Sequence, residues 1–245
     1  MKKILLAVIS ISAFIVTNAQ NKDDKKVTDW SKIDLSNRAN DHFMIQYGLS
    51  DWANAPDSAK PSGFSRHFNF YFMYDKPFKS NPHYSAGIGV GLGGSSMFFE
   101  NTKIDLKYTG TSLPFTNVGA ADHFKKYKLT TMFLEAPLEL RYAANPVTPD
   151  KGFKAAIGLK AGTLLKAYTK GKNLVNATGT TLYGDKYIAK EQDKRLINST
   201  RFAATGRFGY GNISLDVSYQ INGFLKQNAG AVFHPYSIGL TLSGL

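Results

Sequence analysis

The chain has 245 residues, no cysteine and a formal net charge of +12. Without cysteine it forms no disulfide and no thiolate metal site. A positive excess of this size favours an anionic partner such as phospholipid or lipopolysaccharide. Glycine and aromatic residues are frequent and proline is sparse, so composition and length favour β structure, in one large domain or two small ones.

The first 19 residues have the layout of a secretory signal peptide. Lys2 and Lys3 precede an apolar run from Ile4 to Val16, and small residues surround Ala19. This run is shorter than the roughly 20 residues that a helix needs to span a bilayer. We therefore predict export, with residues 1–19 removed by cleavage after Ala19. An exported chain of this kind is not expected to bind nucleic acid.

Two further regions follow the predicted cleavage point. Residues 20–40 are polar and charged and are predicted to form a flexible periplasmic lead. Residues 41–245 are predicted to form the folded domain. No later stretch is apolar enough for a transmembrane helix, but a spanning β-strand needs only about 9–11 residues with every second one apolar.

Eight segments of the domain alternate with period two between a bulky apolar face and a small or polar face. The clearest is near the C-terminus, where Leu215, Val217 and Tyr219 oppose Asp216 and Ser218. The predicted strands cover residues 42–50, 66–74, 83–95, 131–142, 153–167, 201–208, 212–221 and 235–245.

The links between these segments alternate in length. The short ones are "KPFKSNP", "NPVTPDKG" and "GYGN", and the long ones cover residues 52–64, 99–127, 169–198 and 223–232. Outer-membrane barrels combine an even number of strands with short periplasmic turns and longer extracellular loops. We therefore predict an all-β, eight-stranded antiparallel up-and-down transmembrane β-barrel in the outer membrane of a gram-negative bacterium. The alternative is a soluble β-sandwich or lipocalin-like barrel, with its apolar faces turned inward.

One pair of segments resembles a known family. The strand Leu134-Glu135-Ala136-Pro137-Leu138, followed across a short turn by Gly158 to Gly162, is similar to the PorT-like outer-membrane β-barrel family. The resemblance implies an integral barrel, and members of that family are linked to protein secretion. One departure is the last residue, Leu245, where outer-membrane strands usually end on an aromatic side chain.

The strand phase places several charged side chains inside the predicted barrel. An eight-stranded barrel has an interior just wide enough for side chains to fill, so we predict a lumen plugged by ion pairs. The predicted lumen charge cluster consists of Glu135, Glu139, Arg141, Lys154, Lys160, Arg207 and Asp216.

Specific contacts are expected within this cluster. A hairpin register that pairs Tyr142 near Phe153 brings Glu135 opposite Lys160, with Arg141 or Arg207 as alternative partners for the glutamate. Arg207 and Asp216 are expected to lie close together across the "GYGN" turn. Pro137 lacks an N–H for the ladder, so a bulge or an interior side-chain donor is expected there.

No catalytic, cofactor-binding or metal-binding residue is predicted. His83 precedes Ser85 on one face but lies near a short turn, and His123 stands beside Asp122 in a long link, where a solvated histidine is the simpler interpretation. No metal-ligand spacing occurs in the sequence. The glycines of "GVGLGG" lie within a strand with no helix after it, so close packing explains them better than phosphate binding.

The long links carry much of the positive charge. Either these side chains are only solvated, or they contact the phosphates of lipopolysaccharide or another anionic partner. The residues concerned are Lys103, Lys107, Lys125, Lys126, Lys128, Lys170, Lys172, Lys186, Lys190, Lys194 and Arg195.

These observations support three hypotheses of function. The first is a non-enzymatic integral outer-membrane barrel with a structural or partner-binding role, which the family resemblance extends to an accessory of secretion. It would lie among outer-membrane lipid and lipopolysaccharide and bind a protein partner through its loops, without a cofactor. The second is a lipid-modifying outer-membrane enzyme, and the third is a small solute pore.

Overall fold

The structure is a computed structural model that describes residue 38 and residues 42–244. The predicted signal peptide, its cleavage after Ala19 and most of the predicted lead lie outside the described residues. Among the described residues, no helix is long and apolar enough to cross a membrane.

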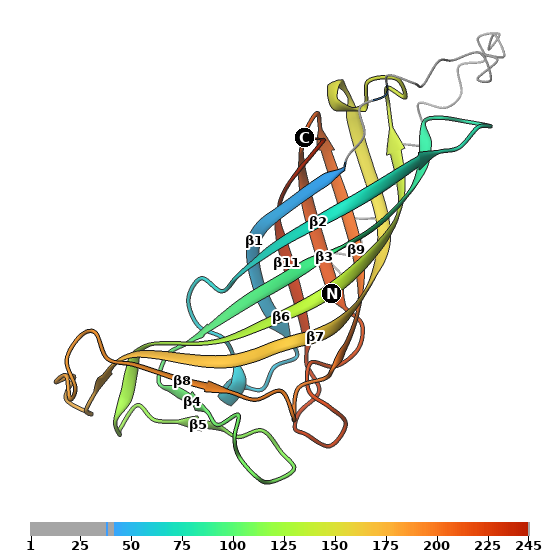
Figure 1. Ribbon diagram of the computed structural model, residues 1–245. Coiled ribbons are helices and arrows are strands. Elements are labelled where there is room, and N and C mark those ends of the chain that lie inside the picture. Colours follow the sequence, from blue (N-terminus) through green and yellow to red (C-terminus); the bar gives the residue numbers. More distant parts are fainter. Residues whose placement is uncertain (1–37, 39–41, 245) are drawn as a thin grey trace, which may run out of the picture. The chain divides into compact units, whose positions relative to one another are not determined.

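The main strands form a closed antiparallel ring in which each strand pairs with its neighbours in the sequence. Pairing of β1 with β11 closes the ring, and Figure 1 shows the strands running side by side. Its members are β1 (Phe43–Ala53), β2 (Arg66–Pro77), β3 (Tyr84–Phe99), β6 (His123–Ala143), β7 (Phe153–Val175), β9 (Thr200–Tyr210), β10 (Ile213–Gln220) and β11 (His234–Ser243).

The long links carry short elements of their own. Figure 1 shows β4, β5 and β8 at the end of the ring opposite the C-terminus, which we call the loop end. β4 (Thr102–Ile104) pairs with β5 (Phe115–Asn117), and β8 (Ile188–Gln192) adds to the free edge of β7. The 3₁₀ turns are η2 (Asp57–Ala59) in the first long link and η3 (Pro149–Lys151) in the short link between β6 and β7.

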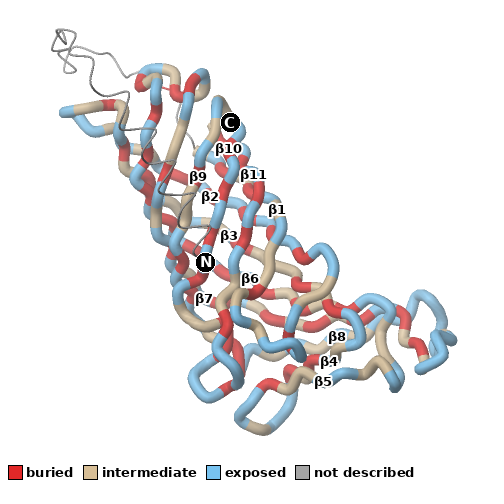
Figure 2. The backbone as a smooth tube through the Cα atoms, turned by 180° about the vertical axis from the view of Figure 1, so that it is seen from behind, coloured by how far each residue is buried: buried red, intermediate tan, exposed pale blue. Residues whose placement is uncertain are grey.

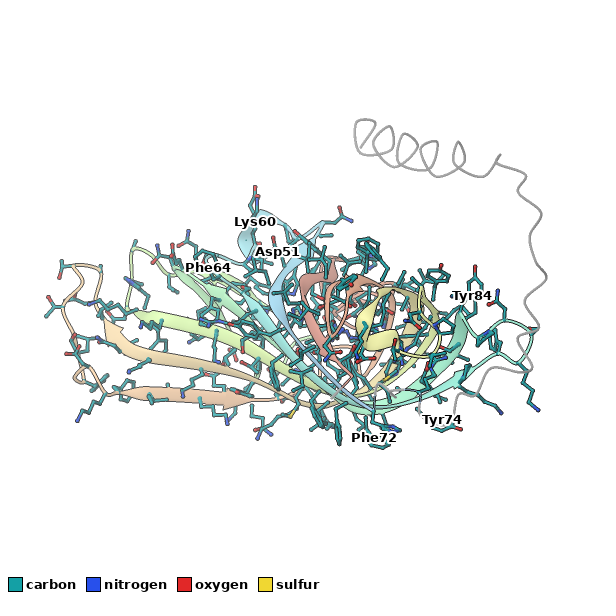
Figure 3. The ribbon with its side chains drawn as sticks, turned by 90° about the horizontal axis from the view of Figure 1, so that it is seen from above. Asp51, Lys60, Phe64, Phe72, Tyr74 and Tyr84 are labelled. Carbon is teal, nitrogen blue, oxygen red and sulfur yellow. The ribbon has the colours of Figure 1, made fainter. Side chains whose placement is uncertain are left out.

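The strands alternate between buried and exposed residues, as Figure 2 shows along their length. The large apolar side chains are outside: Val217 is 47% exposed, while its neighbour Ser218 is 9% exposed. Phe72, Tyr74 and Tyr84 are exposed in the same way (Figure 3). The phase predicted from the alternation is therefore confirmed: the bulky apolar set of the strands lies outside, whereas the soluble alternative requires that set to lie inside.

Several strands are longer than the sequence analysis predicted, and β6 and β7 show the largest extensions. β6 begins at His123 rather than at residue 131, and β7 continues to Val175. The ladder between them shifts between Met132 and Phe133, where Leu165 is the extra residue on β7. Lys126 of β6 and Lys170 of β7, which the sequence analysis places in long links, therefore lie in strands. On β7 the β-bulge changes the phase without ending the strand.

The predicted register of this hairpin is wrong by two residues. Tyr142 pairs with Ala155 rather than Phe153, and Glu135 pairs with Gly162 rather than Lys160. A shift of two residues keeps every side chain on its own face, so alternation cannot distinguish the two registers.

The prediction of an irregularity at Pro137 is correct only in part. Pro137 pairs with Lys160 of β7 without a bulge, and the bulge lies nearer the loop end. On the other side, the pairing of β6 with β3 is interrupted opposite Gly89 and Val90, where the proline has no N–H to give.

Candidate functional site

The middle of the ring's interior is organised around Glu135 of β6. This carboxylate is 1% exposed, and it lies 3.1 Å from Lys160 Nζ and 3.0 Å from Arg201 Nη1. The Tyr71 hydroxyl donates a hydrogen bond to Glu135 Oε2 and accepts one of 3.0 Å from Lys160. Two cations and a phenol thus satisfy one buried carboxylate, as burial of a charge requires.

Glycines on the neighbouring strands make this arrangement possible. Gly162 pairs with both Glu135 and Arg201 and stands between them. A Cβ atom at Gly162 would lie 3.0 Å from Glu135 Cγ, and one at Gly93 would lie 2.4 Å from Glu135 Oε2. Side chains at these positions would therefore crowd the carboxylate, which at Gly93 agrees with the prediction that the glycines of "GVGLGG" serve close packing.

A second buried carboxylate, Glu139, lies one step nearer the short turns. Arg141 Nε donates to it at 2.8 Å, and Arg207 donates to it through Nη2 at 2.6 Å and Nε at 3.1 Å. The two-point contact from Arg207 is the stronger kind of guanidinium–carboxylate pairing. Glu139 pairs with Gly158 of β7, so the two glutamates and the two glycines share a spacing of four residues.

At the short-turn end, Asp75 continues this network. Its carboxylate receives Arg38 at 2.8 Å, Arg141 at 3.4 Å and the Ser85 hydroxyl at 2.7 Å. Arg38, which precedes β1, also donates to the Pro82 carbonyl at 3.3 Å and is 8% exposed. Residue 38 of the predicted lead is therefore held at this end, beside a cavity of about 20 Å³ that Lys154 helps to line.

Asp216 belongs to a separate chain of hydrogen bonds on the β1, β10 and β11 side. Asn69 donates to Gln46 at 3.0 Å, Gln46 donates to Thr241 at 3.0 Å, and Thr241 donates to Asp216 at 2.9 Å. Asp216 also lies 3.8 Å from His67 Nε2.

The loop end of the interior is apolar. Trp52 packs there with ring centroids 4.9 Å from Phe224 and 4.6 Å from Phe233. These rings belong to a group of buried apolar side chains that we call the apolar cluster. Its members come from strands and from loops that fold inward, so the long links help to fill the end of the ring. The apolar cluster consists of Trp52, Met97, Phe99, Ile104, Leu106, Leu113, Tyr127, Leu129, Phe133, Leu164, Ala167, Leu196, Ile197, Phe224, Leu225, Ala229 and Phe233.

The predicted charged residues occupy the interior side of the strands but form different pairs. Glu135 lies within ion-pair distance of Lys160, although through a diagonal contact and not the expected direct pairing. Arg141 and Arg207 bind Glu139 and not Glu135. Arg207 and Asp216 are ladder partners, as predicted. Lys154 lies near the short-turn end.

Sequence reasoning missed several members of these networks. Arg201 and Tyr71 contact Glu135. Asp75 contacts Arg141, the partner of Glu139, and Arg38 contacts Asp75. The repeated four-residue spacing of the glutamates and the β7 glycines was an available signal. A glycine opposite a glutamate leaves room for a long side chain from the next strand, which is how Arg201 reaches Glu135.

The histidines considered for catalysis are held by backbone groups. His83 Nδ1 lies 2.8 Å from the Ala143 carbonyl, and His123 Nδ1 lies 2.9 Å from the Ala121 carbonyl. Within residues 38 and 42–244, no group of three or more histidine and acidic side chains is arranged to hold a metal ion.

None of the curated proteins compared with this chain matches it. One solved structure, the attachment invasion locus protein Ail of Yersinia pestis in complex with the heparin analogue sucrose octasulfate, is similar at 13% identity with a TM-score of 0.34. That alignment covers 82% of this chain and 96% of Ail.

The family comparison covers most of the chain. The model of the family described as "Outer membrane protein beta-barrel domain" matches residues 18–226. Together with a closed ring of strands that is apolar outside and holds buried charged networks in the middle of its interior, this match shows that the chain belongs to the outer membrane protein β-barrel family.

Proposed function

We propose that this chain is a non-enzymatic, integral outer-membrane barrel of eight up-and-down strands whose interior is closed. The outer faces would contact lipid. On β6 the exposed apolar positions run from Tyr142 to Met132. At about 3.3 Å per residue and a tilt of about 45°, this stretch is roughly 25 Å tall, the height of the apolar band of outer-membrane barrels.

The observation that carries the proposal is the filling of the interior at two separate levels. The networks around Glu135 and Glu139 cross the middle of the ring, and the apolar cluster fills the loop end. Ions would have to displace buried salt bridges at one level and enter packed apolar side chains at the other. This supports a structural or partner-binding role and argues against a solute pore.

In this role the barrel would act as a rigid base for its long loops. Side chains from the loops, such as Ile104, Ile197 and Phe233, are 1% exposed or less, so the loops are packed into the mouth and present a formed surface. The expected partner is a protein that binds this surface. The narrower resemblance to PorT-like barrels adds the expectation that this partner belongs to a secretion system.

The proposed orientation places the loop end outside the cell and the short turns in the periplasm. Protease added to intact cells should cut within residues 100–122 or 176–199 and leave the short turns uncut. Cleavage at these links only after the outer membrane has been opened would contradict the orientation.

Solute flux tests the closed interior. The full chain, folded into phospholipid vesicles and checked by its heat-modifiable migration on gels, should not accelerate swelling in small sugars. A general porin serves as the positive control. Rapid swelling that scales with the amount of folded chain would favour the pore alternative and overturn the proposal.

A further inference from the structure

At the loop end, β6 and β7 continue beyond the exposed apolar belt, and the short strand β8 joins them there. The last apolar outward residues of the belt are Met132 on β6 and Leu165 on β7. Beyond them β6 and β7 stay paired from Lys128↔Lys170 to His123↔Val175, and β8 joins the edge of β7. The outward side of this extension carries lysines.

The lysines form a row across the three strands. Lys128 pairs with Lys170, and Lys170 pairs with Lys190. Neighbouring strands lie about 4.8 Å apart, so the Cα atoms of the three lysines lie within roughly 10 Å along the row. The Lys128 ammonium is turned toward β3, where it donates a hydrogen bond of 3.2 Å to Ser96 Oγ. The next row outward repeats the pattern with Lys126 opposite Lys172.

Such a row is unfavourable in the protein alone. Like charges placed directly opposite each other destabilise a sheet, and these distances are within a Debye length at physiological salt. No ion pair within the described part of the chain neutralises Lys128, Lys170 or Lys190. Lysines also protect exposed sheet edges, but that explains only β8, because Lys128 and Lys170 lie on inner strands.

Aromatic rings hold some of these cations on the sheet face. Lys190 Nζ lies 4.3 Å from the centroid of Tyr168, and Lys128 Nζ lies 5.7 Å from the centroid of Phe98. The guanidinium of Arg66 lies 5.5 Å from the same Phe98 ring. The positive face thus extends from β2 to β8, with its charges positioned by cation–π contacts.

We propose that this face, the lysine row, is a binding site for the phosphate groups of lipopolysaccharide in the surrounding outer leaflet. The inference rests on the proposed function, since it requires the belt to lie in the outer membrane. Lys128 then stands roughly 10 Å above Met132 along the membrane normal, at the level of the lipid headgroups. Bound phosphates would relieve the repulsion between the lysines through charge-assisted hydrogen bonds.

Binding of labelled lipopolysaccharide to the full chain, folded in neutral detergent and followed by fluorescence anisotropy, tests this site. The variant K128Q/K170Q/K190Q should raise the Kd on the order of a hundredfold, at roughly fivefold per lost charge near an anionic surface. K76Q/K79Q/K151Q removes the same charge from exposed positions at the short-turn end and should leave the Kd unchanged. The triple arginine variant of the row should retain binding.

The source of the phosphate is tested in the same assay. Lipopolysaccharide stripped of its phosphates should bind weakly, and inorganic phosphate should compete poorly because it lacks the anchoring acyl chains. Equal binding of stripped lipopolysaccharide, effective competition by inorganic phosphate, or equal Kd values for the two triple glutamine variants would overturn the site.

Failure of this site is distinguishable from failure of the proposed function. Removal of the repulsion should leave K128Q/K170Q/K190Q at least as stable as wild type in neutral lipid. K170Q alone should raise the Kd for lipopolysaccharide roughly fivefold. A folded, closed variant that binds lipopolysaccharide like wild type overturns only the inference. A wild-type chain that does not fold into vesicles, or that swells them, overturns the proposed function.

Discussion

The two filled levels of the interior draw their side chains from different parts of the chain. In the middle, every charged member of the Glu135 network comes from a ring strand, with Lys160 on β7 and Arg201 on β9. At the loop end, the apolar cluster takes members such as Leu113 and Leu196 from the long links. The middle is therefore fixed by strand alternation, whereas the loop end depends on loops that fold back.

This difference has an energetic counterpart. A buried charge network is sensitive to the loss of one member, because the remaining charges stay buried without compensation. An apolar cluster loses only the transfer and packing energy of the atoms removed. The two levels should therefore respond differently to single substitutions of similar size.

Glu135→Ala should give the largest effect. It leaves both Lys160 and Arg201 without their carboxylate and should lower the free energy of unfolding by about 3–5 kcal/mol. Lys160→Ala should cost less, because Arg201 and Tyr71 still satisfy Glu135. The measurement is urea unfolding in lipid vesicles, followed by tryptophan fluorescence.

A double-mutant cycle completes this test. The double variant of Glu135 and Lys160 should lose less than the sum of the single variants, and Glu100→Ala, at an exposed position, is the matched control. Single variants as stable as wild type, with no coupling between them, would instead favour a ligand-binding or catalytic acid at Glu135.

A substitution on the outer face tests the proposed lipid contact, and its loss of stability can be compared with the losses in the two interior levels. Val217→Arg should cost about 2–4 kcal/mol if the residue lies near the middle of the bilayer. Val232→Arg makes the same change at a position that is 69% exposed in a loop, and it should be nearly neutral. Equal stability of the two variants in vesicles would show that the β10 face does not contact lipid.

A small change in the apolar cluster should give the smallest effect. Ile197 is 1% exposed, so Ile197→Val should cost about 0.5–1.5 kcal/mol, and the loss should not depend on salt. Ile188→Val, at a position that is 50% exposed, should be neutral. A loss at Ile197 that matches Glu135→Ala would remove the distinction between the two levels.

The sequence was sufficient for the features that depend on period two. Alternation such as that of Val217 and Ser218 predicts the strand faces, and the alternating link lengths locate the loop end. The inward direction of Glu135 and Lys160 also follows from phase alone, because a one-residue slip would reverse it.

Features that depend on register were not predictable in this way. The slip that pairs Glu135 with Gly162 keeps all faces unchanged, and the approach of Arg201 depends on that glycine. The bulge at Leu165 lets β7 change phase and continue to Val175, so the alternation ends too early and predicts Lys170 in a link. The inward folding of Leu113 and Leu196 is a tertiary contact without a local signal.

Single-channel recording tests the closed interior most directly. The wild-type chain, reconstituted in planar bilayers at high salt, should show no unitary conductance above the bare bilayer if, as we propose, the charged networks and the apolar cluster each block the path. Reproducible conductance steps from the folded, heat-modifiable wild-type chain would contradict the account, since both levels would then have to be open to ions.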